Sequence, residues 1–233
     1  YHAPARLEEV IGGVAVGRFV PPSLPAWTWG SERETASPRF WRAAADAIAV
    51  AAEGADVIHA QDRRMIVPTY LAARRTGRPA VLTLRDIGLR CPIATCLVYE
   101  RPGGDIPEDC GARRLYAQCA PLYQHMYQPG NPWAIGPSLK LVGRYGILAW
   151  ERTIARRFAR IAYVSAGLAR HYARVFPVAP TILHSPVAPV APHDCRPAEG
   201  RKIVLYVGKC SEGKGFGDFV GATSFLDEAL YRV

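Results

Sequence analysis

The sequence predicts an α/β fold, in which a doubly wound parallel sheet is followed by the first strand and helix of a second sheet. Three short apolar runs have the length and composition of buried strands, at residues 56–60, 79–84 and 161–164. Segments with a helical spacing of apolar residues lie between them. This alternation of strands and helices favours a parallel sheet that is covered by helices.

The amino-terminal part of the chain supplies the first elements of the pattern. Residues 14–20 are a strand candidate. Ser37 is followed by proline, which suits an N-cap and a first helical position, so we expect a helix from there until Gly54. A second helix is expected over residues 66–75, with Gly77 as its C-cap.

The later elements complete the first sheet. A long helix is predicted over residues 138–160, a short helix over 166–176 and a last short strand over 181–184. Residues 186–200 contain four prolines and no apolar period, which is typical of a linker.

We therefore expect a partial amino-terminal domain with a doubly wound sheet over residues 1–185, a linker over 186–200 and the start of a second domain over 201–233. Within the last segment, the apolar run at 203–207 predicts a strand buried on both faces, and a helix follows near Phe216. A segment of about thirty residues cannot bury a core of its own.

A glycine-rich loop with two lysines joins that strand to that helix. Gly208 ends the strand, Lys209 and Lys214 are five residues apart, and Gly215 precedes the helix. Free N–H groups at a helix start, close backbone approach at glycine and two ammonium groups all attract phosphate. The sequence therefore predicts an anion site at this loop.

Two other interpretations of the loop remain open. The spacing nearly matches a Walker A loop, but Gly215 occupies the position of the Ser or Thr that holds magnesium. The loop could also be a solvated turn with incidental lysines. The motifs elsewhere in the sequence distinguish between these interpretations.

Polar side chains lie at or just beyond the carboxyl ends of the first predicted strands. His59 and Asp62 accompany one strand, and Arg85 and Asp86 follow the next. Ligands of open parallel sheets bind at this edge, so these residues are candidates for a binding cleft. A structural or solvated role is the alternative for each of them.

Composition and charge narrow the class of protein. The chain has 233 residues, 49% hydrophobic content, a mean hydropathy of -0.01 and a formal net charge of +9. No apolar run approaches the about 20 residues that span a bilayer, and we see no signal peptide. The positive charge favours anionic partners. Basic and aromatic residues do not interleave as in single-strand binders, so we expect no nucleic acid.

Four cysteines gather within about thirty residues: Cys91, Cys96, Cys110 and Cys119. A metal site, a disulfide pair and reduced structural thiols are all open. The four, thirteen and eight residues between successive cysteines do not form paired zinc knuckles. We therefore assign no metal and treat a structural zinc as the less favoured interpretation.

The predicted helix over residues 138–160 is basic and amphipathic, with five arginines on it. Such a helix could lie on an anionic membrane. The alternative is a core-facing helix whose basic face is solvated.

The order of the motifs resembles glycosyltransferase family 4, the group 1 family. Residues 56–61 (DVIHAQ) are similar to its DVVHAH strand, and residues 82–86 (LTLRD) to its TLHD strand. Residues 163–165 are similar to its VS strand, and residues 182–187 to the segment written IPNGV. The loop at 208–215 is similar to its donor-phosphate loop.

The resemblance implies a GT-B fold of two Rossmann-like domains and a retaining transfer of sugar from a nucleotide-diphosphate sugar to a glycan, lipid-linked or other hydroxyl acceptor. It implies no required cofactor. Asp86 and Arg85 are the expected catalytic residues, and His59 and Ser165 are cleft candidates. The expected donor-phosphate residues are Gly208, Lys209, Lys214 and Gly215.

Several positions depart from the family pattern. Arg85 replaces the usual His, Lys209 stands where Arg is common, and His184 opens the segment that replaces the Asn-Gly turn. The family's first strand and its Glu-rich donor motif are not found. We therefore expect a chain truncated at both ends that is an incomplete catalyst alone.

The alternative function is a nucleotide-phosphate-binding regulatory domain without transfer activity. The resemblance further implies a bacterial enzyme of cell-envelope or polysaccharide synthesis. We expect it in the cytoplasm, with peripheral contact at the inner membrane face.

Overall fold

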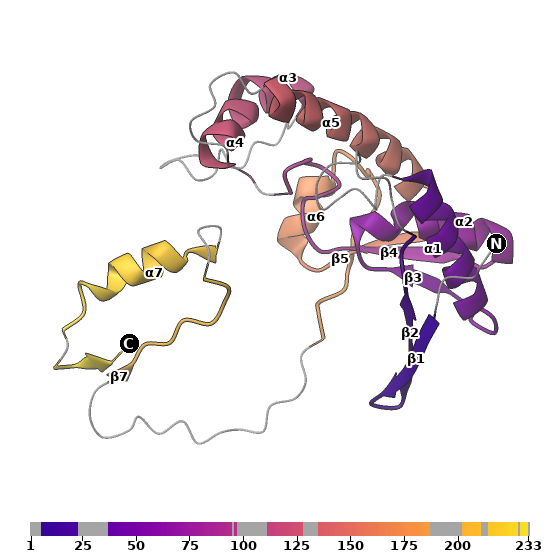
Figure 1. The fold of residues 1–233 in the computed structure, drawn as a ribbon, viewed down its shortest axis with the longest axis horizontal. Helices are drawn as coiled ribbons and strands as arrows, with labels where there is room; N and C mark the ends of the chain where they lie inside the picture. Colours follow the sequence, from indigo (N-terminus) through magenta and orange to yellow (C-terminus); the bar gives the residue numbers. More distant parts are fainter. Residues whose placement is uncertain are drawn as a thin grey trace. The chain divides into compact units, whose positions relative to one another are not determined.

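Figure 1 shows the fold of the protein as a computed structural model. The chain divides into two compact units, Tyr1–Ser185 and Pro186–Val233. The residues that the structure describes are 6–22, 37–94, 96, 111–127, 135–186, 202–210, 214–227 and 229–232. Most of the predicted linker, residues 187–200, lies outside them.

A four-stranded parallel sheet forms the centre of the first unit. Its strands stand in chain order: β3 (Ile58–Ala60), β4 (Ala80–Leu84), β5 (Arg160–Tyr163) and β6 (Thr181–Ile182). Every neighbouring pair is parallel, so all four carboxyl ends lie on one edge. The predicted α/β fold with a parallel sheet is confirmed for this unit.

Both faces of the sheet are covered at its centre. Leu82, Thr83 and Leu84 are consecutive in β4, and each is at most 4% exposed. Successive strand residues point to opposite faces, so burial of all three requires packing on both sides. The main core joins these strands to the helices at residues 66–76, 135–155 and 166–172.

The first two helices begin where the sequence indicates, although α1 ends at Ala51, before the predicted Gly54. α1 (Pro38–Ala51) starts after Ser37, whose side chain makes no capping hydrogen bond, and has proline in its first turn. α2 (Ile66–Thr76) follows the short 3-10 turn η1 (Arg63–Met65). Gly77 ends α2 with φ +68°, as predicted for a C-cap in the left-handed region.

The last two helices of the unit end earlier than predicted. α5 (Ile135–Ala155) ends before the last three of the five arginines in the predicted helix, Arg156, Arg157 and Arg160, because the chain tightens after Ala155 and then enters β5. Phe158 in this turn is buried in the core. α6 (Ala166–Tyr172) ends in a turn that brings Phe176 back to the same core.

Two features of the first unit were not predicted from the sequence. The predicted strand at 14–20 is β2 (Val14–Phe19), but it pairs with an unpredicted β1 (Arg6–Ile11) in an antiparallel hairpin, whose Gly12 and Gly13 both have positive φ. The other feature is helical and packs a small core that includes Leu115 and Leu141. Its elements are α3 (Ala112–Arg114), the π-helical η3 (Leu115–Cys119) and α4 (Ala120–Tyr127).

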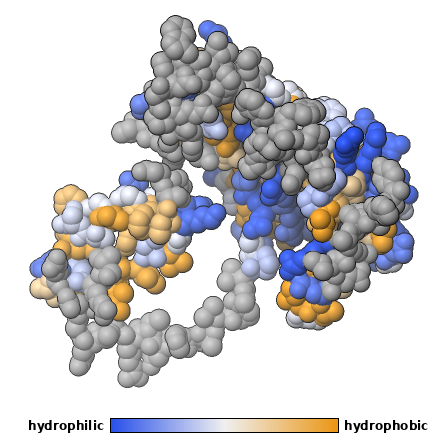
Figure 2. Space-filling view, viewed as in Figure 1, coloured by the Kyte–Doolittle hydropathy of each residue, from blue (hydrophilic) through white to orange (hydrophobic). Residues whose placement is uncertain are grey.

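In its described residues, the second unit is one β–α–β element. β7 (Lys202–Ile203) pairs in parallel with β8 (Tyr231–Arg232), and α7 (Phe216–Thr223) lies between them in sequence. The prediction of a strand buried over residues 203–207 is wrong. The strand stops at Ile203, and Ile203, Leu205 and Val207 are 71%, 77% and 86% exposed. The two short strands and the helix that the structure describes here leave this apolar run uncovered, and hydrophobic residues show on the surface of this unit in Figure 2.

Candidate functional site

Three of the site residues predicted for the first unit lie at the carboxyl edge of the parallel sheet, and His59 lies within it. Arg85 and Asp86 are exposed directly after β4, and Ser165 follows β5 as the N-cap of α6. His59 is exposed within β3, and its Nε2 lies 2.7 Å from Oγ1 of the buried Thr83 on β4. Arg85, Asp86 and Ser165 therefore lie at the carboxyl edge, as parallel strands require, whereas His59 lies within β3 opposite Val81.

Asp86 shapes the turn that it begins. Its Oδ1 accepts a hydrogen bond of 2.7 Å from the amide of Gly88. A β-carbon added at Gly88 would stand 2.8 Å from that same oxygen, so the turn requires glycine there. One carboxylate oxygen is thus committed to the backbone, which fixes the direction of the side chain.

We call residues 86–91 the Asp86 loop, and its backbone is held by the buried Tyr172 of α6 and the half-buried Arg152 of α5. The Tyr172 hydroxyl of α6 donates to the carbonyl of Asp86 at 3.0 Å and accepts from the amide of Leu89 at 3.1 Å. Arg152 of α5 donates from Nε to the Leu89 carbonyl at 2.9 Å and from Nη2 to the Arg90 carbonyl at 2.7 Å. These bonds satisfy loop carbonyls that burial removes from water.

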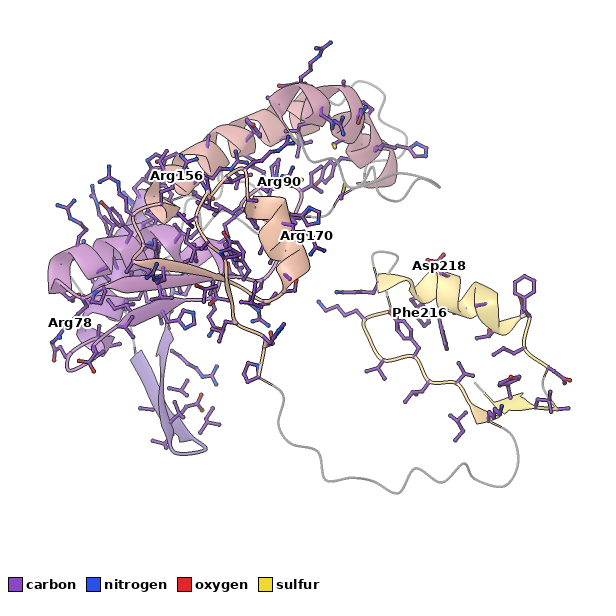
Figure 3. The ribbon with its side chains drawn as sticks, turned by 180° about the vertical axis from the view of Figure 1, so that it is seen from behind. Arg78, Arg90, Arg156, Arg170, Phe216 and Asp218 are labelled. Atoms are coloured by element: carbon purple, nitrogen blue, oxygen red, sulfur yellow. The ribbon has the colours of Figure 1, made fainter. Side chains whose placement is uncertain are left out.

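Two further arginines tie the loop to its surroundings. Arg63 of η1 donates to the Gly88 carbonyl at 3.0 Å and also forms a 3.7 Å ion pair with Glu151, whose side chain is 5% exposed. Arg90, labelled in Figure 3, donates to the carbonyl of His171 at 2.6 Å. The loop is consequently a rigid platform behind the exposed Arg85 and Asp86 side chains.

Burial raises the pKa of the Tyr172 phenol far above its ordinary range. The hydroxyl therefore stays protonated at any physiological pH and remains a donor to the Asp86 carbonyl. Tyr172 was not singled out from the sequence, and Arg152 was assigned to the basic face of its helix. Only the fold shows that both side chains turn toward a loop more than sixty residues away in sequence.

Ser165 has a structural task at this edge. Its side-chain oxygen accepts a hydrogen bond of 3.1 Å from the amide of Leu168, which caps α6. The cap orients the helix that carries Tyr172. Ser165 thus caps the same helix whose Tyr172 hydroxyl donates to the Asp86 carbonyl.

We call residues 208–215 of the second unit the lysine loop, which lies between β7 and α7 in sequence. Lys209 and Lys214 are both exposed, and their backbone carbonyls accept from the same hydroxyl, that of Tyr206, at 2.9 and 3.1 Å. The backbones of the two lysines therefore converge. Gly215 has φ +70° and is the N-cap residue of α7, a conformation that favours glycine.

An acidic residue stands at the same helix start. Asp218 lies in the first turn of α7, as Figure 3 shows, and its Oδ2 would be 3.7 Å from a β-carbon at Gly215. Its carboxylate compensates the positive helix end and competes there with an external anion. The intervening residues 211–213 lie outside the described part of the chain.

The cysteines give no assigned site. Cys91 and Cys119 are buried and Cys96 is half-buried, and none of these three is in a disulfide. Cys110 lies outside the described residues. Across the described ranges, no three His, Cys, Asp or Glu side chains group as a metal ion would need.

A groove of about 960 Å³ lies elsewhere on the first unit, between β2 and α1. Its lining is mostly apolar, and no residue predicted for the site belongs to it. Among the described helices, none combines the length and apolar character needed to cross a membrane. Peripheral contact of α5 with a membrane stays a prediction.

Comparison with known proteins identifies the family of the first unit. Residues 2–184 match the family described as glycosyl transferase 4-like domain. No curated protein and no solved structure matches the chain. The matched range spans nearly all of the first unit and ends before the lysine loop. Since the match covers more than half of the chain, the protein belongs to the glycosyl transferase 4-like family.

Proposed function

We propose that the protein is a retaining glycosyltransferase that moves a sugar from a nucleoside-diphosphate sugar to a hydroxyl group of a glycan or a lipid-linked acceptor. Family membership supports the transfer of a sugar. The convergence of the Lys209 and Lys214 backbones on one hydroxyl at the start of α7 supports the diphosphate donor. We further propose a GT-B arrangement, with the acceptor on the first unit and the donor on the second.

The chemical demand of this reaction is to stabilise a diphosphate as it leaves the anomeric carbon. Two ammonium groups and the amide groups at the start of α7 meet that demand without a metal ion, so we propose that none is needed. Gly215 begins α7 in a left-handed conformation that favours glycine, which brings the loop backbone to the helix start. The negative charge of the leaving group then grows against positive groups that are already in place.

Asp86 and Arg85 are the proposed contacts of the first unit with the reacting groups. Asp86 offers the carboxylate oxygen that Gly88 does not use, which suits it to orient a sugar or acceptor hydroxyl. Arg85 offers a cation beside it for phosphate or another anionic group. His59 is a hydrogen-bonding side chain on β3 that is held by Thr83 of the neighbouring strand.

The test is nucleoside diphosphate binding by the whole chain, measured by calorimetry with UDP, GDP, ADP and dTDP. We expect one of them to bind, and the double change Lys209→Ala with Lys214→Ala to weaken its binding by about 30-fold or more. Lys202→Ala is the matched control, since Lys202 is an exposed lysine of β7 in the same unit. Equal binding by the double variant and the wild type would contradict a donor site at this loop.

A further inference from the structure

One side chain of the second unit connects the helix α7 to the lysine loop. Tyr206 is half-buried, and its ring contacts two phenylalanines of α7. The ring centroids are 5.3 Å from Phe216 in an edge-to-face arrangement and 5.2 Å from Phe219 in a tilted one. Figure 3 labels Phe216 at the start of this helix. Such aromatic contacts fix the ring direction and therefore the position of the hydroxyl.

The hydroxyl of Tyr206 reaches the backbone on both sides of the loop. It donates toward the carbonyl of Lys209 at 2.9 Å and toward the carbonyl of Lys214 at 3.1 Å. A phenol has one proton, so the two carbonyls share it as acceptors. Ring packing alone would be served by phenylalanine, whereas only the hydroxyl holds the two lysine backbones at one point.

Gly208 makes room for this arrangement. A β-carbon there would stand 2.9 Å from the Tyr206 hydroxyl oxygen and 3.1 Å from Cζ. Gly208 is not one of the described glycines that have a positive φ. The glycine is therefore required by contact with Tyr206 and not by an unusual backbone conformation.

We propose that Tyr206 is a positioning residue of the donor-diphosphate site, which sets the spacing of Lys209 and Lys214 and the approach of the loop to α7. The inference rests on the proposed function, since it assigns the loop a diphosphate. Tyr206 itself does not touch the ligand. It acts by fixing two backbone carbonyls, and thereby the direction in which the two lysine side chains extend from the backbone.

The experiment compares the whole wild-type chain with Tyr206→Phe, which keeps the ring and removes the hydroxyl. The control is Tyr231→Phe in β8 of the same unit, where the residue pairs with Lys202. Two quantities are measured: the Kd for inorganic pyrophosphate and the hydrogen exchange of the amides of Lys209 and residues 214–216. We expect Tyr206→Phe to raise the Kd by about threefold to tenfold and to accelerate exchange at these amides, while the control changes neither.

A double-mutant cycle sharpens the assignment. Gly208→Ala should weaken pyrophosphate binding in the wild type because its methyl group displaces the hydroxyl. The same change should cost less in the Tyr206→Phe background, where no hydroxyl remains to displace. Strict additivity of the two changes would contradict the proposed contact.

The outcomes separate this proposal from the proposed function. Tyr206→Phe with wild-type affinity overturns the positioning role, even if exchange accelerates. If pyrophosphate binding depends on Lys209 and Lys214 in that case, the donor site itself survives. A wild-type chain that does not bind pyrophosphate, or that binds it without the two lysines, overturns the donor site and the role of Tyr206 together.

Discussion

The Asp86 loop and the lysine loop both follow a strand of a parallel sheet, but they are supported in different ways. The Asp86 loop is held by Tyr172, Arg152 and Arg63 from three separate elements, behind a strand that is covered on both faces. The lysine loop depends on the Tyr206 hydroxyl, beside a strand of two residues with exposed apolar neighbours.

The two loops differ in how far their backbone carbonyls are removed from water. Buried carbonyls of the Asp86 loop have lost water, so every donor that serves them contributes to the stability of the first unit. The carbonyls of the lysine loop remain near solvent, where a lost donor is partly replaced by water. Changes at the first loop should therefore appear as loss of folding stability, and changes at the second as loss of ligand affinity.

The largest effect on stability is expected for Arg152→Ala. It leaves the buried carbonyls of Leu89 and Arg90 without their donors, which should cost about 2–4 kcal/mol of unfolding free energy. The measurement is urea unfolding followed by circular dichroism. Arg78→Ala, at an exposed arginine, should change the free energy by less than about 0.5 kcal/mol. Similar losses in the two variants would show that Arg152 is merely a surface charge.

Tyr172→Phe should have a smaller effect, of about 1–2 kcal/mol. It keeps the buried ring and removes both hydrogen bonds of the hydroxyl, to the Asp86 carbonyl and from the Leu89 amide. Tyr70→Phe is the control, because the Tyr70 hydroxyl accepts a long hydrogen bond of 3.4 Å from Arg74 at the exposed surface of α2. We expect the control to unfold at the wild-type urea concentration. Unaltered stability of Tyr172→Phe would contradict the assigned role of its hydroxyl.

Glycine substitutions distinguish the Asp86 turn from an ordinary exposed position, and the two should change stability in opposite directions. Gly88→Ala should cost about 1–2 kcal/mol, since its methyl group collides with Asp86 Oδ1. Gly143→Ala on α5, where a β-carbon meets nothing within 4 Å, should add about 0.5–1 kcal/mol of stability. Thermal unfolding of both variants measures the contrast, and a gain at Gly88 would contradict the turn geometry.

The smallest effect concerns the charge at the start of α7. Asp218→Asn should raise the affinity for pyrophosphate by about twofold at low salt, because it removes a carboxylate that competes with the anion. The gain should disappear at about 1 M salt, where exposed charges are screened. Unchanged or weaker binding at low salt would show that the anion does not approach this helix end.

The sequence predicts the frame of the first unit because its strands are short, apolar and followed by polar residues. Residues 56–60 and 79–84 contain β3 and β4, and Gly77 ends α2 as its position indicates. The hairpin of β1 and β2 was missed, although Gly12-Gly13 between apolar runs is a signal for a tight turn. Interpreting that pair as a turn would have identified β1.

The support of the candidate site could not be predicted in the same way. Arg152 and Tyr172 meet the Asp86 loop across 62 to 86 positions of sequence, and only the packing of α5 and α6 on the sheet brings them there. The burial expected for residues 203–207 was wrong, because an apolar run favours a buried strand but does not contain the elements that would cover it. Cover depends on neighbouring elements, which no local pattern contains.

The most direct test of the donor site is to locate the diphosphate on the chain by nuclear magnetic resonance. Pyrophosphate is titrated onto the isotope-labelled protein, and the amide shifts of both loops are followed. We predict saturable shifts at Lys209, Lys214, Gly215 and Phe216, and none at Lys202 in β7. Shifts confined to other parts of the chain would contradict a donor-diphosphate site at this loop. The absence of any shift up to saturating pyrophosphate would contradict it as well.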